Sequence, residues 1–317
     1  MYDIIILGAG PAGLTAGIYG ARSKKNVLII EKSIEGGQMA ETISIENYPG
    51  FDQISGAELG QKMAAQAKNF GAKFVTDEVI SADITGDVKV IHGKMGDYEG
   101  KSLIIAQGSI PRPLGAKGEN EFKGKGISFC ATCDAAFYED LEVYVVGGGD
   151  AAIQEALYIA NFAKKVHIIH RRDRLRAAED IQERAFANEK IDFIWDSAVE
   201  EIKGNKIANE LIIRNLKSGE ITDIKGDEPF GIFVFIGYLP NTELFKGILD
   251  LDDKGYIITD DEMKTKIDGV FAAGDIRKKT IRQIVNAAGD GAIAAMNAQK
   301  YVDAKEGNLY EGFKNNK

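Results

Sequence analysis

The chain has 317 residues, enough for about two domains at ~150 residues each, and 44% of its residues are hydrophobic. Its formal net charge of -9 and pI of about 5.1 give no support to a nucleic-acid or membrane-surface partner. No segment approaches the ~20 apolar residues of a membrane span, and the N-terminus MYDIIILGAG lacks the features of a signal peptide. We therefore expect a cytoplasmic protein.

The first predicted unit spans residues 3–32, DIIILGAGPAGLTAGIYGARSKKNVLIIEK. An apolar run, a Gly-rich turn, an amphipathic helix and a second apolar run form a βαβ pattern. In the turn, Gly8 permits the tight bend, Gly10 lets a diphosphate approach the backbone, and Gly13 keeps helix and strand close. Glu31, after the second run, is the acidic residue that binds a ribose diol, so the unit suits the adenosine of FAD.

The only two cysteines lie three residues apart in FCATCDAAF, residues 129–137. Structural disulfides are rare in the cytosol, so a lone Cys-x-x-Cys there indicates either catalysis or metal binding. Zinc needs about four ligands. The three histidines, His92, His167 and His170, do not have zinc-motif spacing, so we expect no metal site.

Residues 142–171, EVYVVGGGDAAIQEALYIANFAKKVHIIHR, repeat the first unit without a gap. Their Gly-rich turn consists of Gly147, Gly149 and Ala152. One such turn alone is weak support for a nucleotide site, but here each copy has a strand before it, a helix after it and a second strand at the right distance. The repeat predicts two dinucleotide sites.

The two copies differ after the second strand. Where the first copy has its acidic residue, the second has His170, followed by Arg171, Arg172 and Arg176. Guanidinium groups bind a 2′-phosphate with charge-assisted hydrogen bonds, whereas a carboxylate would repel it. The second site therefore favours NADPH over NADH. The alternative, a solvated basic start of a helix, suits Arg174 better than the whole cluster.

A further motif lies in residues 269–295, GVFAAGDIRKKTIRQIVNAAGDGAIAA. A predicted strand, 270–273, ends in Gly274-Asp275, and a predicted helix contains Gly289-Asp290-Gly291. Asp275 at a strand end suits the polyol chain of a flavin, and a nearby helix N-terminus would stabilise a reduced flavin ring. A Gly-Asp pair alone is more often a turn, so this interpretation depends on the first unit.

Two clusters of Gly and Pro, residues 106–113 and 236–242, bracket the second unit and the cysteines. We predict that they are crossing strands between two domains. The FAD-binding domain would comprise residues 1–112 and 243–317, and the inserted NADPH-binding domain, residues 113–242, would carry the Cys-x-x-Cys. The predicted fold class is α/β, with two Rossmann-like dinucleotide-binding domains of which the FAD domain is discontinuous.

The ordered motifs GAGPAG, EGGQ, ENYPG, CATCD, GGGDAA, HRRDRLR, GYLPNT and GVFAAGD...RQIV...AAGDGAIAA resemble those of thioredoxin reductases of the small bacterial type. The resemblance covers the whole chain except the polar tail KEGNLYEGFKNNK. It implies a homodimeric enzyme that uses FAD and NADPH to reduce thioredoxin. It also implies a redox-active disulfide in the NADPH domain.

The resemblance assigns roles to matching residues. Cys133 would lie against the flavin, Cys130 would attack the disulfide of thioredoxin, and Asp134 would act as the acid. The FAD contacts would be Gly8, Gly10, Gly13, Glu31, Glu35, Gly36, Gly37, Gln38, Asn47, Asp275, Arg282 and Gln283. The NADPH contacts would be Gly147, Gly149, Ala152, His170, Arg171, Arg172 and Arg176.

Three positions depart from the family pattern: Gln107 where Thr is common, Ala135 where Gly is usual, and Ala151 where a small hydroxyl residue is frequent. None of them removes a reacting group. Asp134 also suits a helix cap. Because nicotinamide and disulfide would share one domain and one flavin, the resemblance implies a domain rotation between steps.

Alternative functions remain. The disulfide partner could be a protein other than thioredoxin, or the electron donor could be ferredoxin, although the intact second turn and the arginines oppose a ferredoxin donor. A non-catalytic flavin redox sensor is a further alternative, which the absence of an extra interaction domain disfavours.

Overall fold

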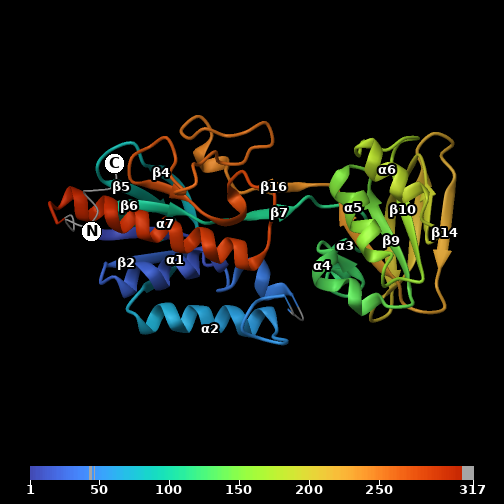
Figure 1. Cartoon of the computed structure of the whole chain (residues 1–317), viewed down its shortest axis with the longest axis horizontal. Helices are drawn as coiled ribbons and strands as arrows, with labels where there is room; N and C mark the ends of the chain where they lie inside the picture. Colours follow the sequence, from blue (N-terminus) through green and yellow to red (C-terminus); the bar gives the residue numbers. More distant parts are fainter. Residues whose placement is uncertain (43–44, 46, 309–317) are drawn as a thin grey trace. The chain divides into compact units, whose positions relative to one another are not determined.

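The computed structural model describes residues 1–42, 45 and 47–308, and the chain forms two compact units (Figure 1). The first unit comprises Met1–Ile110 and Leu239–Lys317, and the second is Pro111–Tyr238. The second unit is thus inserted into the first. The unit boundaries at 110 and 238 lie a few residues before the predicted junctions at 112 and 242.

The first unit is built on a mixed sheet with strand order β3-β2-β1-β6-β5-β4, and β17 also pairs with β6. Its strands are β1 (Tyr2–Leu7), β2 (Val27–Glu31), β3 (Lys73–Thr76), β4 (Val79–Asp83), β5 (Lys89–Gly93), β6 (Asp97–Ile105) and β17 (Val270–Ala272). Strands β3, β2, β1, β6 and β17 pair in parallel, and β5 and β4 extend the sheet in antiparallel. The parallel order is that of a Rossmann-like mononucleotide half.

Both faces of this sheet are covered. Three helices, α1 (Pro11–Arg22), α2 (Gly56–Asn69) and α7 (Ile284–Lys305), pack on one face, where Figure 1 shows α1 between the other two. The opposite face buries Phe245, Leu249 and Ile257. Along β1, Ile4 and Ile6 join the helical core, while Ile5 and Leu7 join the opposite core. This explains why the strand is a continuous apolar run.

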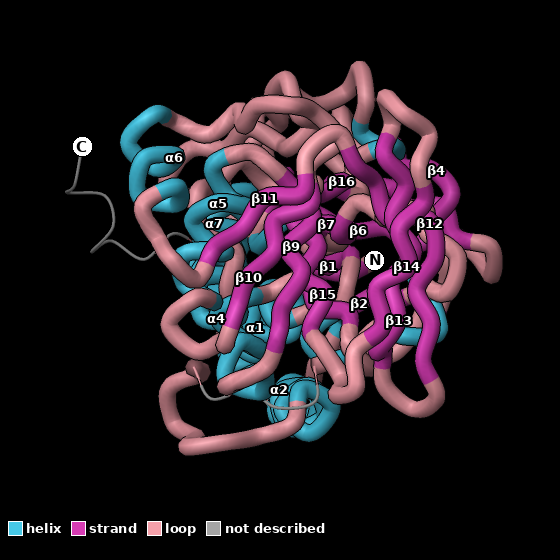
Figure 2. Tube along the Cα trace, turned by 90° about the vertical axis from the view of Figure 1, so that its right-hand side faces the viewer, coloured by secondary structure: helices cyan, strands magenta, loops and turns pink. Residues whose placement is uncertain are grey.

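The second unit contains an all-parallel sheet with strand order β11-β10-β9-β15-β8, whose central strands lie side by side in Figure 2. Its strands are β8 (Ile127–Ser128), β9 (Glu142–Gly147), β10 (Lys165–Ile169), β11 (Ile191–Ile194) and β15 (Gly231–Phe235). One face packs on α5 (Asp150–Ile159) and α6 (Glu179–Phe186). The other packs on an antiparallel sheet of β12 (Ser197–Gly204), β13 (Ala208–Asn215) and β14 (Ile221–Lys225).

The predicted βαβ repeat is confirmed as β1-α1-β2 and β9-α5-β10. The predicted C-terminal strand and helix are β17 and α7. The Gly/Pro clusters form β7 (Ser109–Pro111) and β16 (Tyr238–Pro240), which pair with each other. The α/β class with two Rossmann-like units, one of them discontinuous, is therefore correct.

Shorter helices complete the chain. They are α3 (Glu119–Phe122), α4 (Ala131–Asp134), and the single turns η1 (Gly37–Glu41), η2 (Ala135–Tyr138), η3 (Glu243–Phe245) and η4 (Gly274–Ile276). No helix in the described part of the chain combines the length and apolar character that a membrane crossing needs.

Helices α1 and α7 approach each other so closely that one position on α7 admits no side chain. A Cβ atom at Gly291 would lie 2.1 Å from the carbonyl oxygen of Ala12. Two residues earlier on the same helix, a Cβ atom at Gly289 would meet no atom within 4 Å. The two glycines therefore test close packing and helix propensity separately.

We predict that Gly291→Ala lowers the thermal midpoint of the FAD-loaded protein by about 4–8 °C. The substitution overpacks a contact with backbone, which costs ~2 kcal/mol, and each kcal/mol shifts the midpoint by about 2–4 °C in a unit of this size. Circular dichroism measures the midpoint. Gly289→Ala is the matched control and should leave it unchanged or raise it slightly, because alanine favours the helix. Equal midpoints for the two variants would contradict the packing argument.

Candidate active site

The first Gly-rich turn joins β1 to α1 and leaves the start of the helix open. Gly8 has a φ of +99°, and a Cβ atom there would lie 2.6 Å from the carbonyl oxygen of Ala106. A Cβ atom at Gly13 would lie 1.9 Å from the carbonyl oxygen of Gly8. Gly10 is the N-cap of α1, and a Cβ atom there would meet no atom within 4 Å. The first N–H groups of α1 have no partner within the helix, and no side chain at Gly10 covers them, which fits the binding of a diphosphate.

Glu31 at the end of β2 braces this turn. One carboxylate oxygen accepts a hydrogen bond from the N–H of Ala9 at 2.8 Å, and the other accepts one from the N–H of Ser33 at 2.9 Å. Each oxygen keeps a lone pair. The half-buried carboxylate is therefore fixed in direction and still able to accept hydrogen bonds from ribose hydroxyls.

The predicted segment from Glu35 to Gln38 lies against the same turn. The N–H of Gly36 donates to the carbonyl oxygen of Ala9 at 2.8 Å. A Cβ atom at Gly37 would lie 3.2 Å from the Cα of Gly10. The side chain of Glu35 instead pairs with Lys68 on α2, and Gln38 donates to the carbonyl oxygen of Ser109. The backbone of this segment, rather than its charges, shapes the site.

Two residues of the C-terminal segment, Asp275 and Arg282, each have a buried polar atom without a hydrogen bond among the described residues. Asp275 lies in η4, directly after β17, and its buried Oδ1 has no hydrogen bond among the described residues. Burial raises the pKa of this carboxyl, while Lys279 and Arg282 oppose the rise. Arg282 stacks over Tyr256 at 4.3 Å, with its buried Nε also unpartnered. Buried polar groups normally have partners, so these two groups fit the polar part of a bound cofactor.

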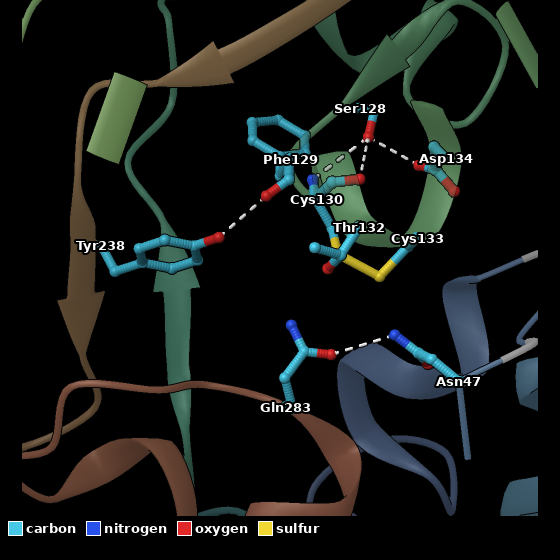
Figure 3. The surroundings of a disulfide bond; sticks show 9 residues. All are labelled: Asn47, Ser128, Phe129, Cys130, Thr132, Cys133, Asp134, Tyr238 and Gln283. Carbon is cyan, nitrogen blue, oxygen red and sulfur yellow. Dashed lines mark hydrogen bonds between the residues drawn. A yellow bond between two sulfur atoms is a disulfide. The ribbon is translucent and has the colours of Figure 1, made fainter. Parts of the chain in front are cut away.

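Asn47 and Gln283 belong to the N-terminal and C-terminal segments of the first unit and are in contact. The side-chain amide of Asn47 donates to the Oε1 of Gln283 at 3.2 Å (Figure 3). Gln283 caps the start of α7. The structure thus joins these two predicted flavin contacts to each other.

The sequence did not reveal how the turn before Asp275 is held. Asp290 on α7 accepts a hydrogen bond from the N–H of Gly274 at 3.0 Å. The ammonium of Lys279 lies 3.0 Å from the same oxygen of Asp290 and 3.8 Å from Oδ1 of Asp275. Asp290 and Lys279 therefore fix the position of Asp275.

The second Gly-rich turn repeats the geometry of the first. A Cβ atom at Gly147 would lie 2.6 Å from both the Cβ of Ala152 and the carbonyl oxygen of Phe235. Gly149 is the N-cap of α5, and a Cβ atom there would meet no atom within 4 Å. Ala152 is fully buried. This turn also fits a diphosphate.

His170 and the arginines behind this turn differ in exposure. His170 is buried beneath Gly148, and its Nε2 has no hydrogen bond within the described chain. Burial lowers its pKa, and the neighbouring arginines act in the same direction. Arg171, Arg172 and Arg176 are exposed, and among the described residues no ion pair engages them. Because α6 begins only at Glu179, these arginines lie in a turn and not at the start of a helix.

Cys130 and Cys133 are joined in a disulfide on α4, which Cys130 caps (Figure 3). Both are half-buried. Asp134, the last residue of α4, accepts a hydrogen bond from the hydroxyl of Ser128 at 2.6 Å. Burial raises the pKa of Asp134, and the Ser128 hydrogen bond opposes the rise. Ser128 was not singled out from the sequence, because nothing in the pattern ISFC distinguishes it.

The predicted residues thus form three groups. The first turn and the groups around Asp275 lie in the first unit. The second turn with its arginines, and the disulfide with Asp134, lie in the second unit. No cluster of three His, Cys, Asp or Glu side chains suited to a metal occurs within residues 1–42, 45 and 47–308.

Comparisons with known proteins agree on one family. A family model described as pyridine nucleotide-disulphide oxidoreductase matches residues 2–291. The chain is 54% identical over 308 residues to a thioredoxin reductase of Peptoclostridium acidaminophilum, covering 96% of this chain and 98% of that protein. It is 46% identical over 305 residues to a thioredoxin reductase of Bacillus subtilis, covering 96% and 95%.

A solved structure agrees with these sequence matches. The crystal structure of thioredoxin reductase from Streptococcus pyogenes is 48% identical and aligns with a TM-score of 0.89, covering 96% of this chain and 99% of that one. The chain therefore belongs to the pyridine nucleotide-disulphide oxidoreductase family, and its relatives there are thioredoxin reductases.

Proposed function

We propose that the protein is an FAD-containing, NADPH-dependent thioredoxin-disulfide reductase. The observation that carries this proposal is that one unit contains both a disulfide with a half-buried acid beside it and a Gly-rich turn followed by arginines without an ion pair among the described residues. Relatives at 46–54% identity, which are thioredoxin reductases, support the choice of thioredoxin as the substrate. The first unit then supplies the FAD site.

The first unit fits FAD. Gly8, Gly10 and Gly13 would hold the diphosphate at the open start of α1, and Glu31 would accept the ribose hydroxyls. Asp275, with its unpartnered buried oxygen, would hold the polyol chain of the flavin. The remaining proposed contacts are Glu35, Gly36, Gly37, Gln38, Asn47, Arg282 and Gln283.

The second unit fits NADPH. Gly147, Gly149 and Ala152 form the turn at the start of α5, where the diphosphate would bind. Arg171, Arg172 and Arg176 would bind the 2′-phosphate, because their guanidinium groups are exposed and unpaired among the described residues. Buried His170 would support the turn from below.

Bound FAD would supply two-electron transfer between NADPH and the disulfide. Cys133 receives the electron pair, the Cys130–Cys133 bond breaks, and Cys130 leaves as a thiolate. Cys130 attacks the disulfide of thioredoxin, and Cys133 then attacks the mixed disulfide and releases reduced thioredoxin. Asp134 supplies a proton to a departing thiolate. The rotation of one domain against the other, expected from the sequence, stays a prediction.

The other functions are less well supported. A ferredoxin donor would not need the second Gly-rich turn or its unpaired arginines. A redox sensor would not need a second nucleotide site. Another protein disulfide remains the nearest alternative to thioredoxin as the substrate.

Anaerobic titration of the purified yellow protein tests the donor. We expect NADPH to bleach the visible flavin band at low equivalents, with NADH much weaker, and oxidised thioredoxin to restore the band. A flavin band that neither nucleotide bleaches would overturn the NADPH proposal and point to an electron donor protein.

Variants of the arginines sharpen this test. Arg171→Ala and Arg172→Ala should each raise the KM for NADPH about tenfold and leave that for NADH unchanged, because each removes a charge-assisted hydrogen bond of ~1.5 kcal/mol. Arg174→Ala, in the same turn, is the matched control. An equal effect of the control on NADPH would show that only general charge matters.

A thiol-trapping experiment tests the roles of the two cysteines. We expect Cys133→Ser to form a stable mixed disulfide with thioredoxin, because Cys130 attacks and no second thiol resolves the adduct. The probe is thioredoxin with a single active-site cysteine, activated by thionitrobenzoate, and non-reducing gels reveal the adduct. Cys130→Ser is the control and should give none. An adduct with Cys130→Ser alone would reverse the assigned roles.

The homodimer and the cytoplasmic location are also proposals. Three apolar side chains on one face of α7, Val285, Ile293 and Met296, are 45%, 40% and 47% exposed. A second copy of the chain would cover this face. A cytoplasmic location suits a disulfide that is reduced in every turnover, and cell fractionation would test it.

We predict by light scattering a mass twice the 34.4 kDa of one chain. Ile293→Glu should convert the protein to a monomer, because it buries a charge in the contact. Ile221→Glu, on exposed β14 of the second unit, is the matched control and should remain dimeric. A monomeric wild type would contradict the proposed homodimer. A dimeric Ile293→Glu variant would show that this face of α7 is not the dimer interface.

A further inference from the structure

The hydroxyl of Ser128 connects the two reacting parts of the redox centre. Ser128 is buried at the end of β8, where it pairs with Phe233 of β15, so the sheet fixes its position. Its Oγ accepts a hydrogen bond from the N–H of Cys130 at 3.1 Å and lies 2.6 Å from Oδ2 of Asp134 (Figure 3). The same hydroxyl therefore touches the backbone of the attacking cysteine and the carboxyl of the acid.

The hydroxyl has one proton and two possible acceptors. Oδ2 of Asp134 lies at 2.6 Å, and the carbonyl oxygen of Cys130 lies at 3.3 Å. While Asp134 is ionised, the proton points to the carboxylate. Once Asp134 is protonated, its O–H can donate to Oγ, and the hydroxyl can turn its own proton to the carbonyl of Cys130. Asp134 thus keeps a hydrogen bond in both protonation states.

We infer that Ser128 is the positioning residue that holds Asp134 in place while its carboxyl gains and loses the proton of thiol-disulfide exchange. This inference rests on the proposed function, because it assumes that Asp134 acts on that proton. Ser128 forms no bond with substrate; it acts through Asp134 and the backbone of Cys130.

The other titratable groups near Asp134 do not form a hydrogen bond or ion pair with its carboxyl among the described residues, so Ser128 is the group that can position it. Tyr138 on η2 faces Asp134, and burial together with the charge of Asp134 raises the pKa of Tyr138 to about 12. Helix α5, packed against α4, carries Asp150 and Glu155. Asp150 accepts a hydrogen bond from the N–H of Ala178 at 2.7 Å, and burial raises the pKa of Glu155. In the described part of the chain no cation pairs with Asp134, and Ser128 is its only side-chain hydrogen-bond donor.

Two variants of the FAD-loaded enzyme and a matched control test the inference. Ser128→Ala should slow the reduction of oxidised bacterial thioredoxin about tenfold, the effect of losing a hydrogen bond to a charged group. Flavin bleaching by NADPH should keep its rate. Ser128→Thr, which retains a hydroxyl, should recover most of the rate. Ser197→Ala removes another buried hydroxyl of the same unit, whose one hydrogen bond among the described residues is to the carbonyl of Trp195, and should leave both rates unchanged.

The pH profile distinguishes positioning from packing. Removing a hydrogen bond to the carboxylate raises the pKa of Asp134 further. The limb of the pH profile that Asp134→Asn abolishes should therefore move to higher pH in Ser128→Ala. In the Asp134→Asn background, Ser128→Ala should cause little additional loss. If the limb of the pH profile does not move in Ser128→Ala, or if Ser128→Ala lowers the rate equally with and without Asp134→Asn, Ser128 has only a structural role.

The outcomes separate the inference from the proposal on which it rests. If Asp134→Asn turns over at the wild-type rate, the proton role of Asp134 fails. If Asp134→Asn is slow but Ser128→Ala is normal, only the role of Ser128 fails. Should Ser128→Ala lose its flavin, difference infrared spectroscopy of the wild type decides: the carboxyl band that Asp134→Asn removes must have the frequency of a hydrogen-bonded acid, and a free-acid frequency would overturn the inference.

Discussion

The backbone of α1 lies so close to its neighbours that several facing positions admit no Cβ atom. A Cβ atom at Gly13 would lie 1.9 Å from the carbonyl of Gly8, and one at Gly291 would lie 2.1 Å from the carbonyl of Ala12. The first approach sets the turn that opens the start of α1 towards a diphosphate. The second joins α1, from the N-terminal segment, to α7, from the C-terminal segment. One steric condition thus forms the cofactor turn and closes the discontinuous unit.

Both units have the Gly-rich turn, but the residues that follow the second strand are acidic in the first unit and basic in the second. In the first unit, backbone N–H groups hold both oxygens of Glu31, so its charge is fixed in direction. In the second unit the equivalent histidine is buried and has a lowered pKa. The positive charge comes from exposed arginines beside it. His170, at the position of the acidic residue, is buried beneath Gly148 and so packs against the turn.

The sequence was sufficient where a local pattern determines the structure. Two Gly-rich turns, each with the strand and helix it needs, predicted both βαβ units, and the Gly/Pro clusters predicted β7 and β16. The sequence was insufficient to predict hydrogen bonds between residues whose contact depends on how separate elements pack. Asp290 appeared only as part of a small-residue helix, because its hydrogen bond to Gly274 depends on how α7 packs. Ser128 could not be singled out, because its bond to Asp134 depends on α4 turning back towards the end of β8.

Two half-buried carboxyl groups, Asp290 and Asp134, have different hydrogen-bond partners. Asp290 lies between the N–H of Gly274 and the ammonium of Lys279, both at 3.0 Å. These two contacts hold the carboxylate of Asp290 in one position, so that it anchors the turn before Asp275. Among the described residues, the one side-chain hydrogen-bond partner of Asp134 is the neutral hydroxyl of Ser128, and burial raises the pKa of Asp134. A hydroxyl can reverse its role from donor to acceptor, whereas an ammonium or a backbone N–H cannot. A proton can therefore enter and leave the carboxyl of Asp134 while its hydrogen bond to Ser128 is kept, as the proposed acid role of Asp134 requires.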